Sequence, residues 1–179
     1  MTRYVALLRG INVGRNKQLP MADLRKLLTG LGYDDVKTHL RSGNAVFGSA
    51  ENEPAKLQTK IETAIADQLG MTVKCLVRSR DEWRAVVDGH PLTELADDGS
   101  RMMALFLSAN PDPALLAEHD PVALDPDHVR LGDRVIYHWC PNGLLEAPPV
   151  GPYVEKNLKL TVTARNWNTV AKLGELLAD

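Results

Sequence analysis

The order of hydrophobic periodicities across residues 4–77 limits the possible folds more than any other feature of this sequence. Residues 4–8 form a short, nearly continuous apolar run, which is typical of a strand inside a sheet. Pro20 suits the first position of a helix, and apolar residues follow it at helical spacing. Residues 36–47 then run out and back around a Ser-Gly-Asn turn, which predicts a hairpin.

A second helix and a final strand complete this first pattern. Pro54 opens a helix with apolar residues on one face as far as Leu69, Gly70 ends it, and residues 71–77 follow as a strand. The order strand, helix, strand, strand, helix, strand is the ferredoxin-like pattern. It predicts a four-stranded antiparallel sheet with both helices on one face.

The second half of the chain repeats this pattern more weakly. We expect strands at 102–107, 129–131, 135–139 and 160–163, helices at 110–116 and 149–158, and an amphipathic terminal helix at 167–177. The predicted fold class is therefore α+β, with antiparallel sheets that carry helices on one face. The chain would consist of tandem ferredoxin-like βαββαβ units plus a C-terminal helix.

A change of composition to Pro, Gly and Asp between residues 89 and 100 indicates a boundary between the two halves. We predict an N-terminal ferredoxin-like unit at residues 1–80, a connecting helix and loop at 81–100, and a C-terminal unit with the terminal helix at 101–179. The connecting helix should begin with a capping box made by Ser79 and Glu82. Such a cap stabilises a helix by ~1 kcal/mol.

The overall charge and the lengths of the apolar stretches limit which partners and locations we expect for this protein. A formal net charge of -2 gives no general attraction to nucleic acids or acidic membranes, so either partner would need a local basic patch. The apolar stretch before Arg9 is too short for a secretory signal, and no stretch approaches the roughly 20 apolar residues of a membrane helix. We therefore expect a cytoplasmic protein without a membrane partner.

The cysteines and histidines predict no disulfide framework and no metal centre. Cys75 and Cys140 lie far apart, Cys75 in an apolar run and Cys140 at a strand end. The five histidines show no metal-ligand spacing and no paired cysteines accompany them. We expect no metal and no cofactor.

Two polar, glycine-containing stretches should meet because of the topology alone. In a ferredoxin-like unit, the end of the first strand and the hairpin turn lie at the same end of the sheet. Arg9–Gly14 should therefore lie beside Ser42-Gly43-Asn44. Their glycines would let backbone N–H groups approach a ligand, and Asn12 and Asn44 supply donors and acceptors. The alternative is an ordinary loop stabilised by Asn12 and an ordinary hairpin turn.

A third polar stretch, Thr163–Thr169, precedes the predicted terminal helix, with Thr163 or Asn166 as its N-cap. Arg165 would then lie in the first turn, where a cation opposes the helix dipole at a cost of ~0.3 to 1 kcal/mol. A bound phosphate or carboxylate would compensate that charge. The alternative is that Arg165 pairs with Glu155 or another acid of the protein and that Asn166 only caps the helix.

Together the three stretches resemble one family of uncharacterised bacterial proteins, catalogued as domain of unknown function 1697. The matching segments lie within residues 6–14, 40–47 and 163–170, and their order and distances fit nearly the whole chain. Arg15 stands where the family often has a second Gly, and Arg41 where it often has Gln, so both departures add positive charge. The segment before Tyr153 is also shorter than usual. The resemblance implies α+β proteins built from ferredoxin-like units, without an established activity.

These features predict a protein that binds a small anionic ligand, bearing phosphate or carboxylate, at a site formed by the three stretches. Arg15 and Arg41 would lie at its rim. No residue stands out as a general base, which favours binding over catalysis and leaves enzymatic activity open. The expected ligand-binding residues are Arg9, Gly10, Asn12, Ser42, Gly43, Asn44, Arg165 and Asn166.

Two other functions stay open at this point. Ferredoxin-like modules can bind single-stranded nucleic acid by stacking bases on aromatic residues of the sheet face, for which the strands offer Tyr4 and Phe47. The chain could also be a protein-interaction or homodimerisation module, which would need an exposed apolar patch. Both a monomer and a homodimer are compatible with the sequence.

Overall fold

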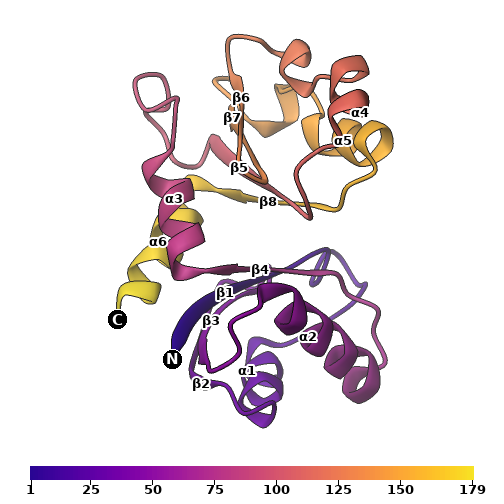
Figure 1. The fold of residues 1–179 in the computed structure, drawn as a ribbon, viewed down its shortest axis with the longest axis vertical. Coiled ribbons are helices and arrows are strands. Elements are labelled where there is room, and N and C mark those ends of the chain that lie inside the picture. Colours follow the sequence, from indigo (N-terminus) through magenta and orange to yellow (C-terminus); the bar gives the residue numbers. More distant parts are fainter. The chain divides into compact units, whose positions relative to one another are not determined.

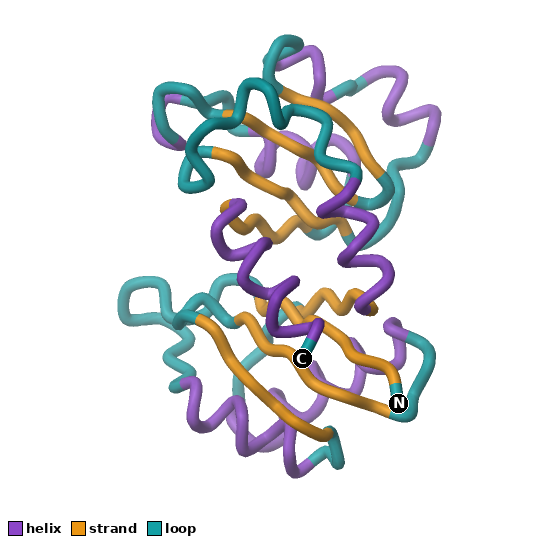
Figure 2. The backbone as a smooth tube through the Cα atoms, turned by 90° about the vertical axis from the view of Figure 1, so that its left-hand side faces the viewer, coloured by secondary structure: helices purple, strands orange, loops and turns teal.

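The structure, a computed structural model, describes all residues from 1 to 179 and contains two compact units. The first unit comprises residues 1–84 and 172–179, and the second comprises residues 85–171. Each contains one four-stranded antiparallel sheet with helices packed against it, seen as labelled elements in Figure 1 and as orange strands in Figure 2. The predicted α+β class with two repeated units is confirmed.

The first unit has the strand order and connections of a ferredoxin-like fold. Its elements are β1 (Thr2–Leu8), α1 (Met21–Gly30), β2 (Asp34–His39), β3 (Asn44–Ser49), α2 (Pro54–Leu69), β4 (Cys75–Ser79) and the start of α3 (Arg80–Asp88). The strands are ordered β2-β3-β1-β4. Helix α1 packs on β2 and α2 packs on β4, and both contribute to one core on the same face of the sheet (Figure 1).

The core of the first unit is closed by aromatic residues from the strands. Tyr4 of β1 and Phe47 of β3 are 1% and 0% exposed. Tyr33 stacks on Phe47 with ring centroids 4.5 Å apart. Leu57 and Ile61 of α2 are buried in the same cluster, because they repeat at helical spacing on one face of that helix.

The second unit repeats the same topology with shorter helices. Its elements are β5 (Met102–Leu107), α4 (Pro113–Glu118), the 3-10 helix η1 (Pro121–Leu124), β6 (Val129–Gly132), β7 (Val135–Trp139), the 3-10 helix η2 (Leu144–Glu146), α5 (Val150–Leu158), β8 (Val162–Asn166) and the start of α6 (Trp167–Ala178). The order β6-β7-β5-β8 matches that of the first sheet. Helix α5 packs on β8, and η1 packs on β6.

Some element limits differ from the sequence prediction for local reasons. The hairpin turn occupies residues 40–43, since β2 ends at His39 and Leu40 takes a φ of +61°. The helix expected from residue 110 begins at Pro113, because Asp112 caps it by accepting from two backbone N–H groups. The strand expected at 160–163 runs from Val162 to Asn166.

The strand registers of the two sheets correspond position by position. Tyr4 lies opposite Phe47 in the first sheet, as Met103 lies opposite His138 in the second. Ala6 lies opposite Val77, as Leu105 lies opposite Ala164. The two units can therefore be compared residue by residue.

The predicted capping box at the start of α3 is confirmed. The backbone N–H of Ser79 donates to Glu82 Oε2 at 2.7 Å, and the N–H of Glu82 donates to Ser79 Oγ at 3.2 Å. At the corresponding end of β8, Asn166 Oδ1 accepts from the N–H of Thr169 at 3.0 Å. Asn166 is therefore the cap of α6. None of the helices combines the length and the apolar character needed to cross a bilayer.

Candidate functional site

Three loops of the first unit meet at one end of its sheet: residues 9–20, 40–43 and 70–74. The N–H of Leu8 donates to the carbonyl of Gly43 at 2.8 Å, and the N–H of Arg9 donates to the carbonyl of Lys74 at 2.9 Å. The predicted proximity of Arg9–Gly14 to the hairpin turn is confirmed. It follows directly from the central position of β1, which pairs with both β3 and β4.

Asn12 closes the first of these loops with its side chain. Its Nδ2 donates to the carbonyls of Leu19 at 2.8 Å and Arg41 at 2.6 Å, and its Oδ1 accepts from the N–H of Leu19 at 2.8 Å. The residue has a φ of +56°, a conformation that Asn tolerates better than most residues. Asn12 thus joins the loop to the hairpin. This agrees with the alternative given above, in which Asn12 stabilises an ordinary loop.

The hairpin turn depends on Gly43 and Asn44. Gly43 has a φ of +91°, and a Cβ there would lie 2.7 Å from Leu8 Cβ and 2.9 Å from Ile11 Cδ1. Asn44 is fully buried, and its Nδ2 donates to the His39 carbonyl at 2.8 Å and to Ser42 Oγ at 3.0 Å. These residues therefore shape the turn, whereas Ser42 itself is exposed.

The surface of these three loops is cationic. None of them contains Asp or Glu, and together they carry five exposed cationic side chains, which are Arg9, Arg15, Lys17, Arg41 and Lys74. Lys17 Nζ donates to the carbonyl of Thr72 at 2.7 Å, which ties two of the loops together. The chain as a whole has a net charge of -2, so this concentration of positive charge is local.

Arg165 does not lie in a helix, which corrects the prediction that its charge opposes a helix dipole. Strand β8 continues to Asn166, and α6 begins only at Trp167, so Arg165 is a strand residue. It is 8% exposed, and its Nη1 donates to Thr163 Oγ1 at 2.8 Å and to the Ala164 carbonyl at 2.9 Å.

Arg165 has a counterpart in the first unit. Arg78 precedes the cap Ser79, as Arg165 precedes the cap Asn166, and Arg78 is 3% exposed. Each arginine donates from Nη1 to the carbonyl of the preceding residue, at 3.2 Å for Arg78. A buried arginine before the cap is thus a shared feature of the repeated fold. The assignment of Arg165 and Asn166 to an anion site remains a prediction.

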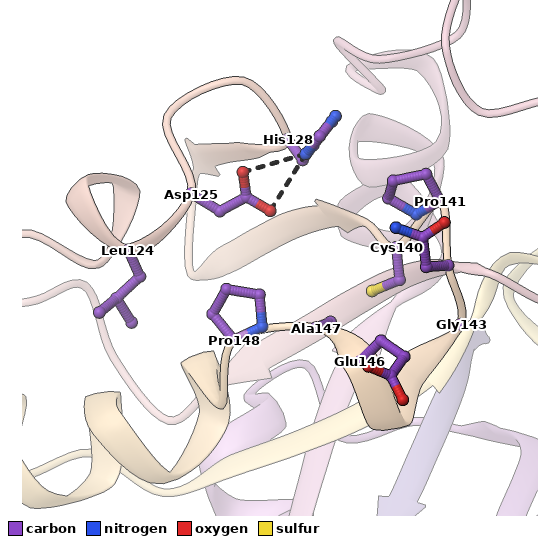
Figure 3. A pocket seen from close by; sticks show the side chains of 10 residues that line it. Leu124, Asp125, His128, Cys140, Pro141, Gly143, Glu146, Ala147 and Pro148 are labelled. Atoms are coloured by element: carbon purple, nitrogen blue, oxygen red, sulfur yellow. Dashed lines mark hydrogen bonds and ion pairs between the residues drawn. The ribbon is translucent and has the colours of Figure 1, made fainter.

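A cavity in the second unit, lined by both polar and apolar residues, brings together residues that the sequence did not single out (Figure 3). It has a volume of about 260 Å³ and is lined by parts of the segment 140–148 with Leu124, Asp125 and His128. Nδ1 of His128 lies 3.0 and 3.1 Å from the two carboxylate oxygens of Asp125. Because a carboxylate only accepts, Nδ1 is the donor in this contact.

The chemistry of this cavity is limited by its cysteine. Burial, followed by the charge of Asp125, raises the pKa of Cys140 to about 11, so the thiol is protonated near neutral pH and is a poor nucleophile. No group of three His, Cys, Asp or Glu side chains is placed to hold a metal ion. In the sequence, the pair of Asp125 and His128 appears only as an Asp-x-x-His spacing before β6. A search for the spacing of metal ligands overlooks this pair.

The aromatic residues proposed for nucleic-acid stacking are inside the protein. Tyr4 and Phe47 belong to the core between the first sheet and helices α1 and α2. Neither ring offers a face on which a base could stack. The nucleic-acid alternative therefore loses the two residues on which it depended.

Known proteins supply a family and a fold for this chain. A family model described as "Protein of unknown function (DUF1697)" matches residues 1–137. A solved structure, that of the conserved bacterial protein SP0830 from Streptococcus pneumoniae, is similar with 26% sequence identity and a TM-score of 0.68, covering 98% of each chain. No curated protein matches the chain.

Proposed function

We propose that this chain, which belongs to the DUF1697 family of proteins of unknown function, binds a small phosphate- or carboxylate-bearing anion at the cationic loops of its first unit. The observation that carries this proposal is the set of five exposed cations on three adjoining loops that contain no carboxylate. Like charges repel one another, so a bound anion would stabilise this arrangement.

Arginine side chains are the main proposed contacts. Arg9 follows β1 directly, and Arg41 lies in the hairpin turn to which Asn12 joins the first loop. A guanidinium group can donate two parallel hydrogen bonds to a phosphate or carboxylate, which gives both affinity and orientation. Arg15, Lys17 and Lys74 extend the positive surface around them.

The backbone of the first loop supports anion binding as well. Positive φ values occur at Gly10 (+70°), Asn12 (+56°) and Gly14 (+59°). The N–H of Asn12 already donates to the carbonyl of Lys17 at 3.0 Å, so a ligand would approach the backbone at Gly10 and Gly14, where no atom lies within 4 Å of a Cβ position. In this proposal Asn12, Gly43 and Asn44 hold the loops in place, and Ser42 lies exposed beside Arg41.

Isothermal titration calorimetry with inorganic phosphate, pyrophosphate, citrate and a short single-stranded oligonucleotide tests the proposal. We expect Arg9→Ala and Arg41→Ala to weaken binding of the best small anion about tenfold to a hundredfold, since a hydrogen bond to a charged group contributes ~1.5 to 3 kcal/mol. Lys60→Ala is the matched control, because Lys60 is an exposed cation on α2, outside the three loops.

Each remaining outcome has a defined meaning. Absence of binding by all the small anions, or equal binding by the Arg41→Ala variant and the wild type, would refute the proposal. Affinity for the oligonucleotide alone, falling steeply with salt, would replace it with nucleic-acid binding. Arg165→Ala tests the third predicted stretch, since loss of binding in that variant would add Arg165 to the site.

A further inference from the structure

The second unit contains a largely apolar cavity of about 360 Å³ on the helix-covered face of its sheet. Its floor is formed by four strand residues, Met103, Leu105, His138 and Ala164. Its walls come from residues between Leu144 and Pro152, at η2 and the start of α5. The volume lies within the range of small-molecule sites, which are mostly apolar with a few polar groups.

The first unit shows that this cavity is not a necessary consequence of the fold. The corresponding four positions are Tyr4, Ala6, Phe47 and Val77, and all four lie in its closed core. There, Tyr33 stacks on Phe47, and α2 covers the sheet with 16 residues. In the second unit, His138 replaces the Phe, Ala164 replaces the Val, and α5 has 9 residues. Smaller side chains at three of the four positions and a shorter helix leave the space open, although Leu105 is larger than Ala6.

His138 is the polar side chain on the floor of this cavity. It is 3% exposed, and burial lowers its pKa below the ordinary value, although the charge of Asp125 acts in the opposite direction. Its buried Nε2 has no hydrogen-bond partner, and the nearest carboxylate oxygen, Asp125 Oδ2, is 3.7 Å away. A neutral imidazole offers one donor and one acceptor. Nε2 itself is closed to the cavity and lies on the side of Asp125, so the imidazole must rotate about χ2 to turn a nitrogen toward a ligand. That rotation breaks no hydrogen bond of Nε2, because this atom has no partner within hydrogen-bond distance.

The lining also limits the charge of a ligand. Asp125 lies beside His138 and disfavours a second negative charge at this position. The other strand residues of the floor are apolar, so a charged group buried against them would lose its hydration without compensation. At the rim, Leu144 is 57% and Leu145 100% exposed, which extends apolar contact area to the mouth of the cavity.

We infer that this cavity is a second ligand site, separate from the cationic loops, which takes a small uncharged molecule with an apolar body and one hydroxyl or carbonyl group directed at His138. The apolar body fills the space over Met103, Leu105 and Ala164. The polar group exchanges a hydrogen bond with the imidazole. This ligand differs in chemical class from the anion proposed for the first unit.

Binding of 1-naphthol and naphthalene, followed by fluorescence and by NMR shifts of second-unit amides, tests this inference. We expect the wild type to bind both, with 1-naphthol about two- to tenfold tighter because of the hydrogen bond to His138. The double substitution His138→Phe with Ala164→Val copies the residues of the first unit and should abolish both interactions. The single substitution His138→Leu should bind both probes equally, because it keeps the apolar lining and removes the nitrogen atoms.

The matched control is Ala114→Val, which adds the same methyl groups at an exposed position of α4 outside the cavity and should bind both probes like the wild type. Failure of the wild type to bind either probe would overturn the inference. Unchanged 1-naphthol binding in the folded double variant would overturn the location, and a retained preference for 1-naphthol in His138→Leu would overturn the role of His138.

Discussion

The two units share a topology and a strand register, yet they differ at the two places where a ligand could bind. In the first unit, residues 9–20 connect β1 to α1 in a long cationic loop, and the core beneath the helices is closed. In the second unit, residues 108–112 make the corresponding connection, and the sheet carries an open cavity. The first unit therefore has a long cationic loop at one end of its sheet, whereas the second unit has a cavity on one face of its sheet.

The short loops of the second unit use their polar groups internally. Asn110 donates to the carboxylate of Asp133 at 2.9 Å and accepts from the N–H of Arg134 at 2.8 Å. The equivalent loops of the first unit contain no acid and expose their cations. One arrangement of strands thus supports two different surfaces, because the side chains and loop lengths vary while the hydrogen-bonded sheet does not.

The largest effect on stability should come from exchanging the residue that differs between the closed core of the first unit and the open core of the second. Phe47→His places in the first unit the residue that the second unit has at the corresponding position. We expect a loss of about 3 to 5 kcal/mol in the free energy of unfolding, since the stacking on Tyr33 is lost and an imidazole is buried among apolar side chains. Urea unfolding measures this loss.

The reciprocal substitution is its control. His138→Phe fills existing space in the second unit, so its stability should stay within about 1.5 kcal/mol of the wild type, as overpacking is relieved by the cavity. Equal losses of stability for Phe47→His and His138→Phe would show that the core of the first unit is not more closely packed than that of the second.

Gly43→Ala should have the next largest effect, because an added Cβ would strain the turn whose Gly43 carbonyl accepts from the N–H of Leu8 in β1. A Cβ would come within 3 Å of Leu8 and Ile11, and the φ of +91° adds strain. We expect a loss of roughly 2 to 4 kcal/mol in the free energy of unfolding. Gly10→Ala is the matched control. It also has a positive φ, but no atom lies within 4 Å of its Cβ position, so only about 1 to 2 kcal/mol should be lost. Equal losses would exclude close packing as the cause.

Local sequence patterns predicted most of this fold. Leu57, Ile61 and Ile65 specify one buried face of α2 by their spacing alone, and all three are 0% exposed. The capping box of Ser79 and Glu82 was predictable for the same reason, since both of its hydrogen bonds lie within three residues. The meeting of the first two polar stretches followed from the order of the strands.

Features that depend on distant pairing were not predictable from one sequence. Arg165 was expected in a helix because nothing local shows that β8 continues to Asn166, which lies opposite Met103. The cavity over His138 depends on how far α5 extends along a sheet whose strands lie elsewhere in the sequence. The repeat itself was visible only as a pattern, because Tyr4 and Phe47 correspond to Met103 and His138, which are chemically different.

The smallest predicted effect concerns pH and two histidines of the second unit. Burial lowers the pKa of His138 and of His90, whose ring contacts Trp167 and whose Nδ1 accepts from the N–H of Leu92 at 3.1 Å. The folded state then binds fewer protons than the unfolded state below pH about 6.5, so stability should decrease as the pH falls through that value. The slope cannot exceed ~1.4 kcal/mol per pH unit for each histidine, and partial exposure of His90 makes its share smaller.

Urea unfolding midpoints of the wild type and His90→Phe, measured between mildly acidic and neutral pH, test this expectation. The variant keeps an aromatic ring beside Trp167 but cannot take up a proton, so its stability should decrease less steeply on acidification. It should be less stable than the wild type at neutral pH, because the N–H of Leu92 loses its acceptor. The curves of the two proteins should therefore converge toward acidic pH, and parallel curves would show that His90 is already protonated freely in the folded second unit.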